Sequence, residues 1–280
     1  MLQHGYMNRN NSIINQLREA YGSKESIDRK ISVSRFIYRP ISFYLAVPFV
    51  RLGFSANGVT LLRFLIAIVG FFLLARGGYA LMLAGSVVLF FSALLDFVDG
   101  NVARFRKETS HFGTFLEDVT DTVVKAVIPL AVSIGLYMRA DYVLISFGNQ
   151  IPQGLILIMG ATAALAIAFQ GMLSYRLRAA LLEMEGAKTD ARPTSAHPQP
   201  PLEGAPSVSQ RLANGTVFWL TREAYFMLGG ITLFAIFNIM SVFLLIRWTA
   251  SLIHFVFACI QTPRRARRAL NRYRPLETSL

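Results

Sequence analysis

Several apolar runs of about 20 residues dominate the sequence, and this is the length that an α-helix needs to cross the hydrocarbon core of a bilayer. Four runs lie at 55–74, 79–95, 113–137 and 154–173, and the apolar stretch at 221–260 has room for two more. Hydrophobic residues make up 54% of the chain and charged residues 16%, whereas about a quarter of a soluble domain is charged. The sequence therefore predicts an all-α polytopic membrane protein with six transmembrane helices.

Residues 31–54 precede the first span and mix aromatic side chains with three arginines. Pro40 and Pro48 interrupt this segment, so we expect it to lie in the membrane interface as an amphipathic helix rather than to cross. The expected organisation is a cytoplasmic N-terminal segment with this juxtamembrane helix (1–54), a six-span membrane domain (55–262) and a basic cytoplasmic tail (263–280). Residues 186–215 are rich in Pro, Ala and Ser, which predicts a flexible cytoplasmic loop.

The net charge of +12 has a better explanation than nucleic-acid binding. Cytoplasmic segments of membrane proteins carry an excess of Lys and Arg, and basic clusters are attracted to anionic headgroups. Placing both termini in the cytoplasm satisfies nearly all of the basic clusters. Two positions could hold the turn between spans five and six, Phe237-Asn238 or Arg247-Trp248, and the charge rule favours the first. A single cysteine, Cys259, excludes an internal disulfide.

Acidic side chains stand at the inner ends of spans two and three. If the second span continues inward as a helix, Asp96 and Asp99 share one stripe with small residues, and Glu117 and Asp121 share a stripe on the next helix. Ionisable residues at the edge of a bilayer are costly and usually mark a functional site. Four carboxylates are the hard ligands that Mg²⁺, Mn²⁺ or Ca²⁺ prefers, and no cluster of Cys or His competes for a softer metal.

The complete pattern resembles a known signature. It reads Asp96-x2-Asp99-Gly100-x2-Ala103-Arg104-x8-Gly113-x3-Glu117-x3-Asp121. This is similar to the signature of the CDP-alcohol phosphotransferase (CDP-alcohol phosphatidyltransferase) family, which comprises integral membrane enzymes of phospholipid synthesis. The departure is Glu117, where the family normally has Asp. Its additional methylene either shifts the metal or weakens one metal site.

The resemblance implies a transferase that uses two Mg²⁺ or Mn²⁺ ions. It implies that Asp96, Asp99, Glu117 and Asp121 hold the metals and that Asp121 also serves as the base. It further implies that Gly100 and Ala103 make room for the cytidine, that Arg104 helps to hold the nucleotide, and that Thr60 lies near it. An alcohol would attack the phosphorus distal to cytidine, and CMP would leave. In the usual bacterial reaction the donor is CDP-diacylglycerol and the acceptor is a small alcohol.

Several basic and polar residues outside the signature have two possible explanations each. Ser55 or Asn57 can cap the helix of span one, and Thr60 lies in its first turn, so capping explains these residues nearly as well as a ligand role for Thr60. Arg63, one turn further, should face a carboxylate or extend to the interface. Lys125 could bind an anionic acceptor or neutralise the acidic cluster. Arg176 and Arg178 could also select a phosphorylated acceptor.

Other functions remain open at this point. Within the family, the donor could be a CDP-linked headgroup, or the acceptor could be of the inositol-phosphate type. Outside this activity, the same carboxylates could serve a cation transporter, and Glu117 raises the alternative of a non-catalytic member. For the enzyme we expect a homodimer in contact with membrane lipids, placed in a bacterial inner membrane with its site on the cytoplasmic side.

Overall fold

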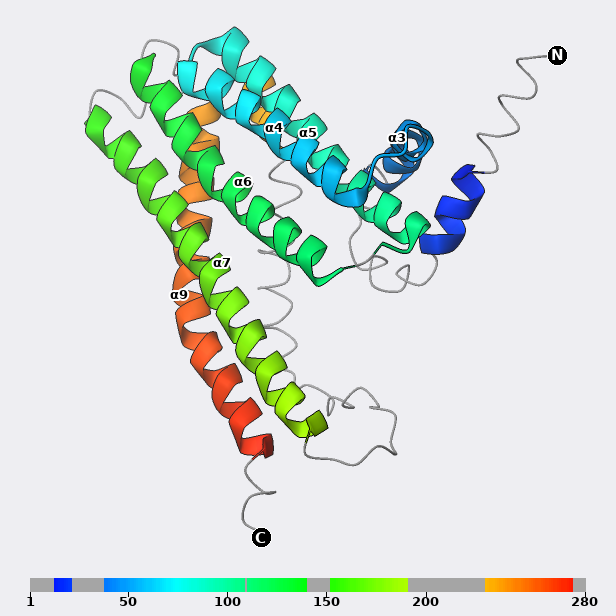
Figure 1. The fold of residues 1–280 in the computed structure, drawn as a ribbon. Helices are drawn as coiled ribbons and strands as arrows, with labels where there is room; N and C mark the ends of the chain where they lie inside the picture. The colour runs from blue at the N-terminus through cyan, green and yellow to red at the C-terminus, as the bar shows by residue number, and fades with distance from the viewer. Residues whose placement is uncertain (1–12, 22–37, 109, 140–151, 191–229, 274–280) are drawn as a thin grey trace, which may run out of the picture.

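The computed structural model describes residues 13–21, 38–108, 110–139, 152–190 and 230–273. The helices with defined bounds are α3 (Arg39–Arg51), α4 (Ala56–Arg76), α5 (Tyr79–Arg106), α6 (His111–Met138), α7 (Gln153–Asp190) and α9 (Met240–Tyr273) (Figure 1). Residues 13–21 and 230–236 are also helical, and the described ranges contain no β-strand. The all-α prediction is confirmed.

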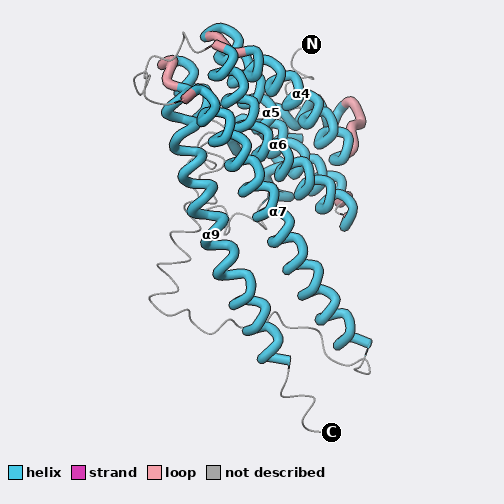
Figure 2. Tube along the Cα trace, turned by 90° about the vertical axis from the view of Figure 1, so that its left-hand side faces the viewer, coloured by secondary structure: helices cyan, strands magenta, loops and turns pink. Residues whose placement is uncertain are grey.

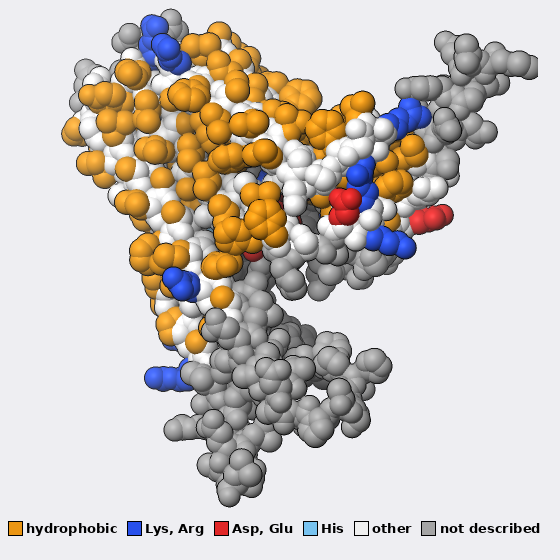
Figure 3. Space-filling model, viewed as in Figure 1, with side chains coloured by type: hydrophobic (Ala, Val, Ile, Leu, Met, Phe, Trp, Pro, Cys, Tyr) orange, Lys and Arg blue, Asp and Glu red, His pale blue; other side chains and the backbone are white. Residues whose placement is uncertain are grey.

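Five of these helices, α4, α5, α6, α7 and α9, are long and apolar enough to cross a membrane. Hydrophobic side chains cover most of the face of this bundle that Figure 3 shows, and charged side chains gather at its ends. The chain is therefore an integral membrane protein. Part of the remaining predicted span, residues 221–229, lies outside the described residues, and the five helices are consistent with the predicted count of six.

The preferred position of the last turn is confirmed. Residues 237–238 form a turn between the helical residues 230–236 and the start of α9. Asn238 has a φ of 55°, in the left-handed region that asparagine tolerates better than most residues. Arg247 consequently lies within α9.

The helices alternate in direction and pack mainly on their neighbours in sequence. α4 packs against α5 and α6, α6 against α7, and α7 against α9. Helices α7 and α9 run side by side and extend beyond the rest of the bundle (Figures 1 and 2). The C-terminal ends of α5, α7 and α9 and the N-terminal ends of α4 and α6 therefore point to the same side.

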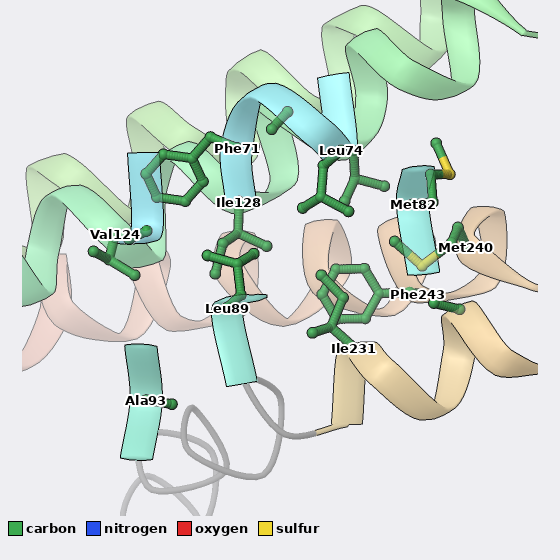
Figure 4. Close-up of a cluster of buried hydrophobic side chains, with 14 of the residues drawn as sticks. Phe71, Leu74, Met82, Leu89, Ala93, Val124, Ile128, Ile231, Met240 and Phe243 are labelled. Carbon is green, nitrogen blue, oxygen red and sulfur yellow. The ribbon is translucent and has the colours of Figure 1, made fainter. Parts of the chain in front are cut away.

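A buried apolar cluster joins four of the helices. Phe71 and Leu74 of α4, Leu89 of α5, Ile128 of α6 and Phe243 of α9 point toward one another (Figure 4). Because lipid is as apolar as these side chains, close packing and not removal from water must supply much of the stability. This packing fixes the depth at which polar residues on different helices face each other.

The expected juxtamembrane helix is present as α3, whereas the start of the predicted loop at 186–215 is helical. Pro48 lies inside α3 without ending it, and α3 packs a buried face, including Phe43 and Val47, against α5. Residues 31–37 of the expected juxtamembrane helix lie outside the described residues. At the other end, α7 continues to Asp190, so residues 186–190 of the predicted flexible loop are helical. The rest of that loop, 191–215, is not described.

Candidate functional site

Three aspartates surround one guanidinium in the middle of the bundle. Arg63 on α4 forms an ion pair through Nη1 with Oδ1 of Asp96, and its Nε lies 3.9 Å from Oδ2 of Asp99. Nη1 also lies 3.6 Å from Oδ1 of Asp121 on α6. Only 4% of the Arg63 side chain is exposed. The expectation that Arg63 faces a carboxylate is confirmed.

The antiparallel order of the helices explains why these residues meet. Arg63 follows the start of α4 by about two turns, and Asp99 precedes the end of α5 by the same length, roughly 10 Å. Asp121 is about three turns into α6, on the same side of the bundle. Residues at similar distances from one end of the bundle lie at similar depth, so the spacing in sequence becomes proximity in space.

Hydroxyl groups from three residues hold Asp99 and Arg63 in place. Oγ1 of Thr60 donates a hydrogen bond of 2.9 Å to Oδ2 of Asp99. Nη2 of Arg63 donates to Oγ1 of Thr120 over 3.0 Å, and Oγ of Ser92 donates to the backbone carbonyl of Arg63 over 3.1 Å. These contacts hold Arg63 from α5 and α6 at once. Ser55 is the cap of α4, as one of the two predicted alternatives has it, because its Oγ accepts a 3.1 Å hydrogen bond from the backbone N–H of Gly58.

A second basic side chain joins the cluster at Asp121. Nζ of Lys125, one turn further along α6, forms an ion pair with Oδ2 of Asp121. Lys125 therefore neutralises part of the acidic cluster, which is one of its two predicted roles. The site combines buried carboxylates with two permanent positive charges.

Glu117 is the most exposed of the four signature carboxylates. Its side chain is exposed, one turn before Asp121 on α6. Its negative charge is close enough to Asp96 and Asp99 to interact with both of them. The structure thus gathers three of the four predicted metal ligands around one cation and places the fourth at the open edge.

The small residues of the signature border Arg104. A Cβ atom added to Gly100 would lie 3.4 Å from each terminal nitrogen of the Arg104 guanidinium. Nη2 of Arg104 donates a 2.7 Å hydrogen bond to Oδ1 of Asn101, and the guanidinium lies 5.7 Å from the centre of the Tyr21 ring. Ala103 is half-buried against the apolar cluster between α3, α4 and α5. The space left open at Gly100 therefore faces an arginine that is held in place.

The N-terminal ends of α4 and α6 lie next to each other beside this cluster. Ser110 caps α6 by accepting a 3.0 Å hydrogen bond from the backbone N–H of Gly113. A Cβ atom on Gly113 would lie 3.1 Å from Oδ1 of Asn57 at the start of α4. Glycine at this signature position permits the close approach of the two helix ends.

Sequence reasoning did not identify four polar residues of this region. Thr120 and Ser92 hold Arg63, and Nδ2 of the buried Asn101 donates a 3.0 Å hydrogen bond to Oγ of Ser42 on α3. A signal for two of them was present. Ser92 precedes Asp96 by one helical turn, and Thr120 follows Glu117 by three residues, so each polar residue lies near a signature stripe.

The residues considered for the acceptor lie further along α7. The Arg176 side chain is exposed, and no ion pair or hydrogen bond within the described ranges joins it to the site aspartates. The Arg178 side chain lies outside the described part of the chain. Their acceptor role remains a prediction.

The donor set fits a divalent cation in its chemistry. Within the described ranges, no group of three or more Asp, Glu, His or Cys side chains is arranged to hold a metal by itself. Instead, the guanidinium of Arg63 fills the space among Asp96, Asp99 and Asp121. Hard carboxylate oxygens from two helices already face a common positive charge, which is the ligand type that Mg²⁺ and Mn²⁺ prefer.

Comparison with known proteins identifies the family. No match was found among curated proteins. Residues 54–189 match the model of the CDP-alcohol phosphatidyltransferase family. The matched segment begins just before α4, ends in α7 and contains Arg63 and all four signature carboxylates. The match confirms that residues 54–189 resemble the CDP-alcohol phosphatidyltransferase family, as the spacing of the acidic residues predicted.

Proposed function

We propose that the protein is a metal-dependent CDP-alcohol phosphotransferase. It transfers a substituted phosphate group, the phosphatidyl group of CDP-diacylglycerol, to the hydroxyl of a small alcohol and releases CMP. The observation that carries this proposal is the convergence of Asp96, Asp99 and Asp121 from two helices on a single cationic group. A divalent cation held there and by Glu117 would neutralise the pyrophosphate of the donor as its charge increases.

The depth of the site supports a lipid substrate. The aspartates lie roughly 10–15 Å from the helix ends, where a water-soluble cytidine and acyl chains in the bilayer can both reach them. Basic residues are concentrated at this end of the bundle: Arg104, Arg106, Lys107, Arg176, Arg264, Arg265 and Arg267. The positive-inside rule then assigns this end to the cytoplasm, where CDP-linked donors are available.

The three aspartates differ in exposure, and this difference supports the roles proposed for them. The Asp96 and Asp99 side chains are 8% and 5% exposed, whereas Asp121 is 20% exposed. Asp96 and Asp99 are held by Arg63 and Thr60, as fixed ligands should be. Asp121 is the most accessible of the three, which suits a base that must reach an incoming alcohol.

In the proposed reaction, Asp121 accepts the proton of the acceptor hydroxyl. The alcohol oxygen forms a bond to the phosphorus distal to cytidine, and the bond between that phosphorus and the CMP oxygen breaks. The part of the site that takes the cytidine nucleotide is lined by Gly100, Ala103, Arg104 and Thr60. Positive charge for an anionic acceptor is provided by Lys125, Arg176 and Arg178. Arg104 is restrained by Asn101 and Tyr21, so little side-chain freedom is lost when it binds.

The test is CMP release by the purified protein in lipid. CDP-diacylglycerol is supplied with Mg²⁺ or Mn²⁺ and a panel of alcohols, and the lipid product is identified by mass. We expect CMP and one new lipid, with both lost in Asp121→Asn. Flux of the divalent cation into vesicles without CMP release would support a transporter, and the absence of both activities would support a non-catalytic member.

A further inference from the structure

We propose that Arg63 and a divalent cation occupy the same carboxylates in turn. In the metal-free protein the guanidinium of Arg63 holds Asp96, Asp99 and Asp121 together, and metal binding displaces it from them. This inference rests on the metal-dependent function proposed above. It adds that the guanidinium of Arg63 occupies the site in the absence of metal and that the metal must displace it.

The contacts of Arg63 support exchange rather than coexistence. Oδ1 of Asp96 is already paired with Nη1 of Arg63 in a buried position, and the same Nη1 also faces Asp121. A metal ion bound to these oxygens would stand next to the guanidinium, with like charges a few ångströms apart and little solvent to screen them. The two cations therefore compete for Asp96 and Asp121.

The charge of the cluster explains why a resident cation is needed. The cluster contains four carboxylates and two basic side chains. The carboxylates are those of Asp96, Asp99, Glu117 and Asp121, and the basic side chains are those of Arg63 and Lys125. Without Arg63, the buried aspartates would repel one another and separate whenever the metal is absent. With Arg63, the cluster stays assembled, and its four carboxylates still outnumber its two basic side chains, so it offers oxygen ligands to a divalent cation.

The surroundings of Arg63 also provide for its release. Nη2 donates a hydrogen bond to the neutral hydroxyl of Thr120, and the hydroxyl of Ser92 donates to the backbone carbonyl of Arg63. The side chain can leave the aspartates without breaking the contact that anchors its backbone. Displaced from Asp96, its positive charge becomes available to the phosphates of an anionic donor.

Binding of Mn²⁺ measured by electron paramagnetic resonance tests the exchange directly. We compare the wild type, Arg63→Met, Arg63→Lys and the control Arg106→Met, whose arginine pairs with Glu108 at 3.8 Å. Arg63→Met should bind Mn²⁺ at least tenfold more tightly than the wild type, because the competing cation is gone. Arg106→Met should match the wild type, and Arg63→Lys should lie between.

A second measurement uses the wild type alone, so that it does not depend on the folding of a variant. Modification of Arg63 by phenylglyoxal, read by peptide mass, should be slow without metal and several-fold faster with saturating Mn²⁺. Equal Mn²⁺ affinity in wild type and Arg63→Met, or unchanged protection of Arg63, would overturn the exchange while leaving the proposed function intact. Absence of Mn²⁺ binding in every variant would overturn the proposed function and the exchange together.

Discussion

The hydroxyl of Thr60 on α4 donates a hydrogen bond to Oδ2 of Asp99 on α5 at 2.9 Å, and both side chains are buried. The same hydroxyl also lies 3.2 Å from the carbonyl oxygen of Ala56. A hydroxyl has one proton, and a charged carboxylate is the stronger acceptor. The contact therefore ties the first turn of α4 to the second aspartate of the signature and fixes the rotamer of that carboxylate.

Replacing Thr60 with Val should destabilise the protein and weaken metal binding. The substitution keeps the shape but leaves a buried carboxylate without its donor, which costs about 1–3 kcal/mol. Thr60→Ser keeps the hydroxyl and serves as the matched control. The measurements are the thermal unfolding midpoint in detergent and the Mn²⁺ affinity, and a midpoint for Thr60→Val equal to that of Thr60→Ser would contradict the structural role.

Asp121→Asn should lower CMP release by about 10²- to 10⁴-fold, the range that a positioned general base contributes. The substitution preserves volume but removes the group that accepts the proton. Asp118→Asn is the control, because Asp118 is an aspartate of the same helix three residues before Asp121 but is not one of the signature carboxylates. Initial rates at saturating donor should remain near wild type for the control. Comparable losses in both variants would indicate a general disturbance of α6.

The positions of the signature aspartates could be predicted from sequence because two simple regularities combine. Helical periodicity places Asp96 and Asp99 on one stripe, and antiparallel spans of similar length bring that stripe to the depth of Asp121. The cost of an unpaired charge in a span left two positions for Arg63, beside a carboxylate or at the interface, and the structure shows the first. These arguments need only local geometry and the membrane, and the structure confirms that Arg63 meets those carboxylates.

The remaining features depend on packing that no local pattern encodes. The contact of Thr120 with Arg63 requires the relative rotation of α4 and α6. The position of Arg104 beside Tyr21 requires the placement of residues 13–21, which lie far away in sequence. The continuation of α7 to Asp190 also exceeds what its Pro- and Ala-rich neighbourhood indicated, because helix length beyond the membrane is set by small differences in propensity.

Glu117 offers a test of the one departure from the family signature. Glu117→Gln should raise the Mg²⁺ concentration needed for half-maximal CMP release, because a ligand is lost from the open edge of the site. Glu117→Asp restores the residue usual in the family and should keep activity, with a changed metal requirement that reflects its shorter reach. The measurement is a Mg²⁺ titration of initial rates. If the glutamine variant titrates like the wild type, Glu117 is not a metal ligand.

Removal of metal should abolish activity without unfolding the protein. EDTA should stop CMP release, and excess Mg²⁺ or Mn²⁺ should restore it, because carboxylates are the ligands these ions prefer. The fold should persist, since Arg63 and Lys125 partly neutralise the buried aspartates in the absence of metal. Circular dichroism during thermal unfolding checks this. Unfolding of the wild type by EDTA at room temperature would show that the ion pairs do not maintain the site.

The packing of α6 against α7 should tolerate only a small residue at position 160, so a larger one should lower the stability of the protein. A Cβ atom on Gly160 would overlap the Ser133 side chain and lie 2.8 Å from the carbonyl oxygen of Pro129, whereas Gly154 on the same helix faces open space. Gly160→Val should therefore cost about 1–3 kcal/mol through overpacking, and Gly154→Val should leave the unfolding midpoint nearly unchanged.

Because α6 also carries Asp121, separating it from α7 would move the proposed base relative to Arg63 on α4. Gly160→Val should thus lose CMP release in addition to stability, even at temperatures where it remains folded. Size-exclusion chromatography and circular dichroism identify the folded fraction, and rates are expressed per folded molecule. A stable Gly160→Val protein with full activity would show that α6 is positioned by α4 and α5 alone and that its packing on α7 does not hold the site.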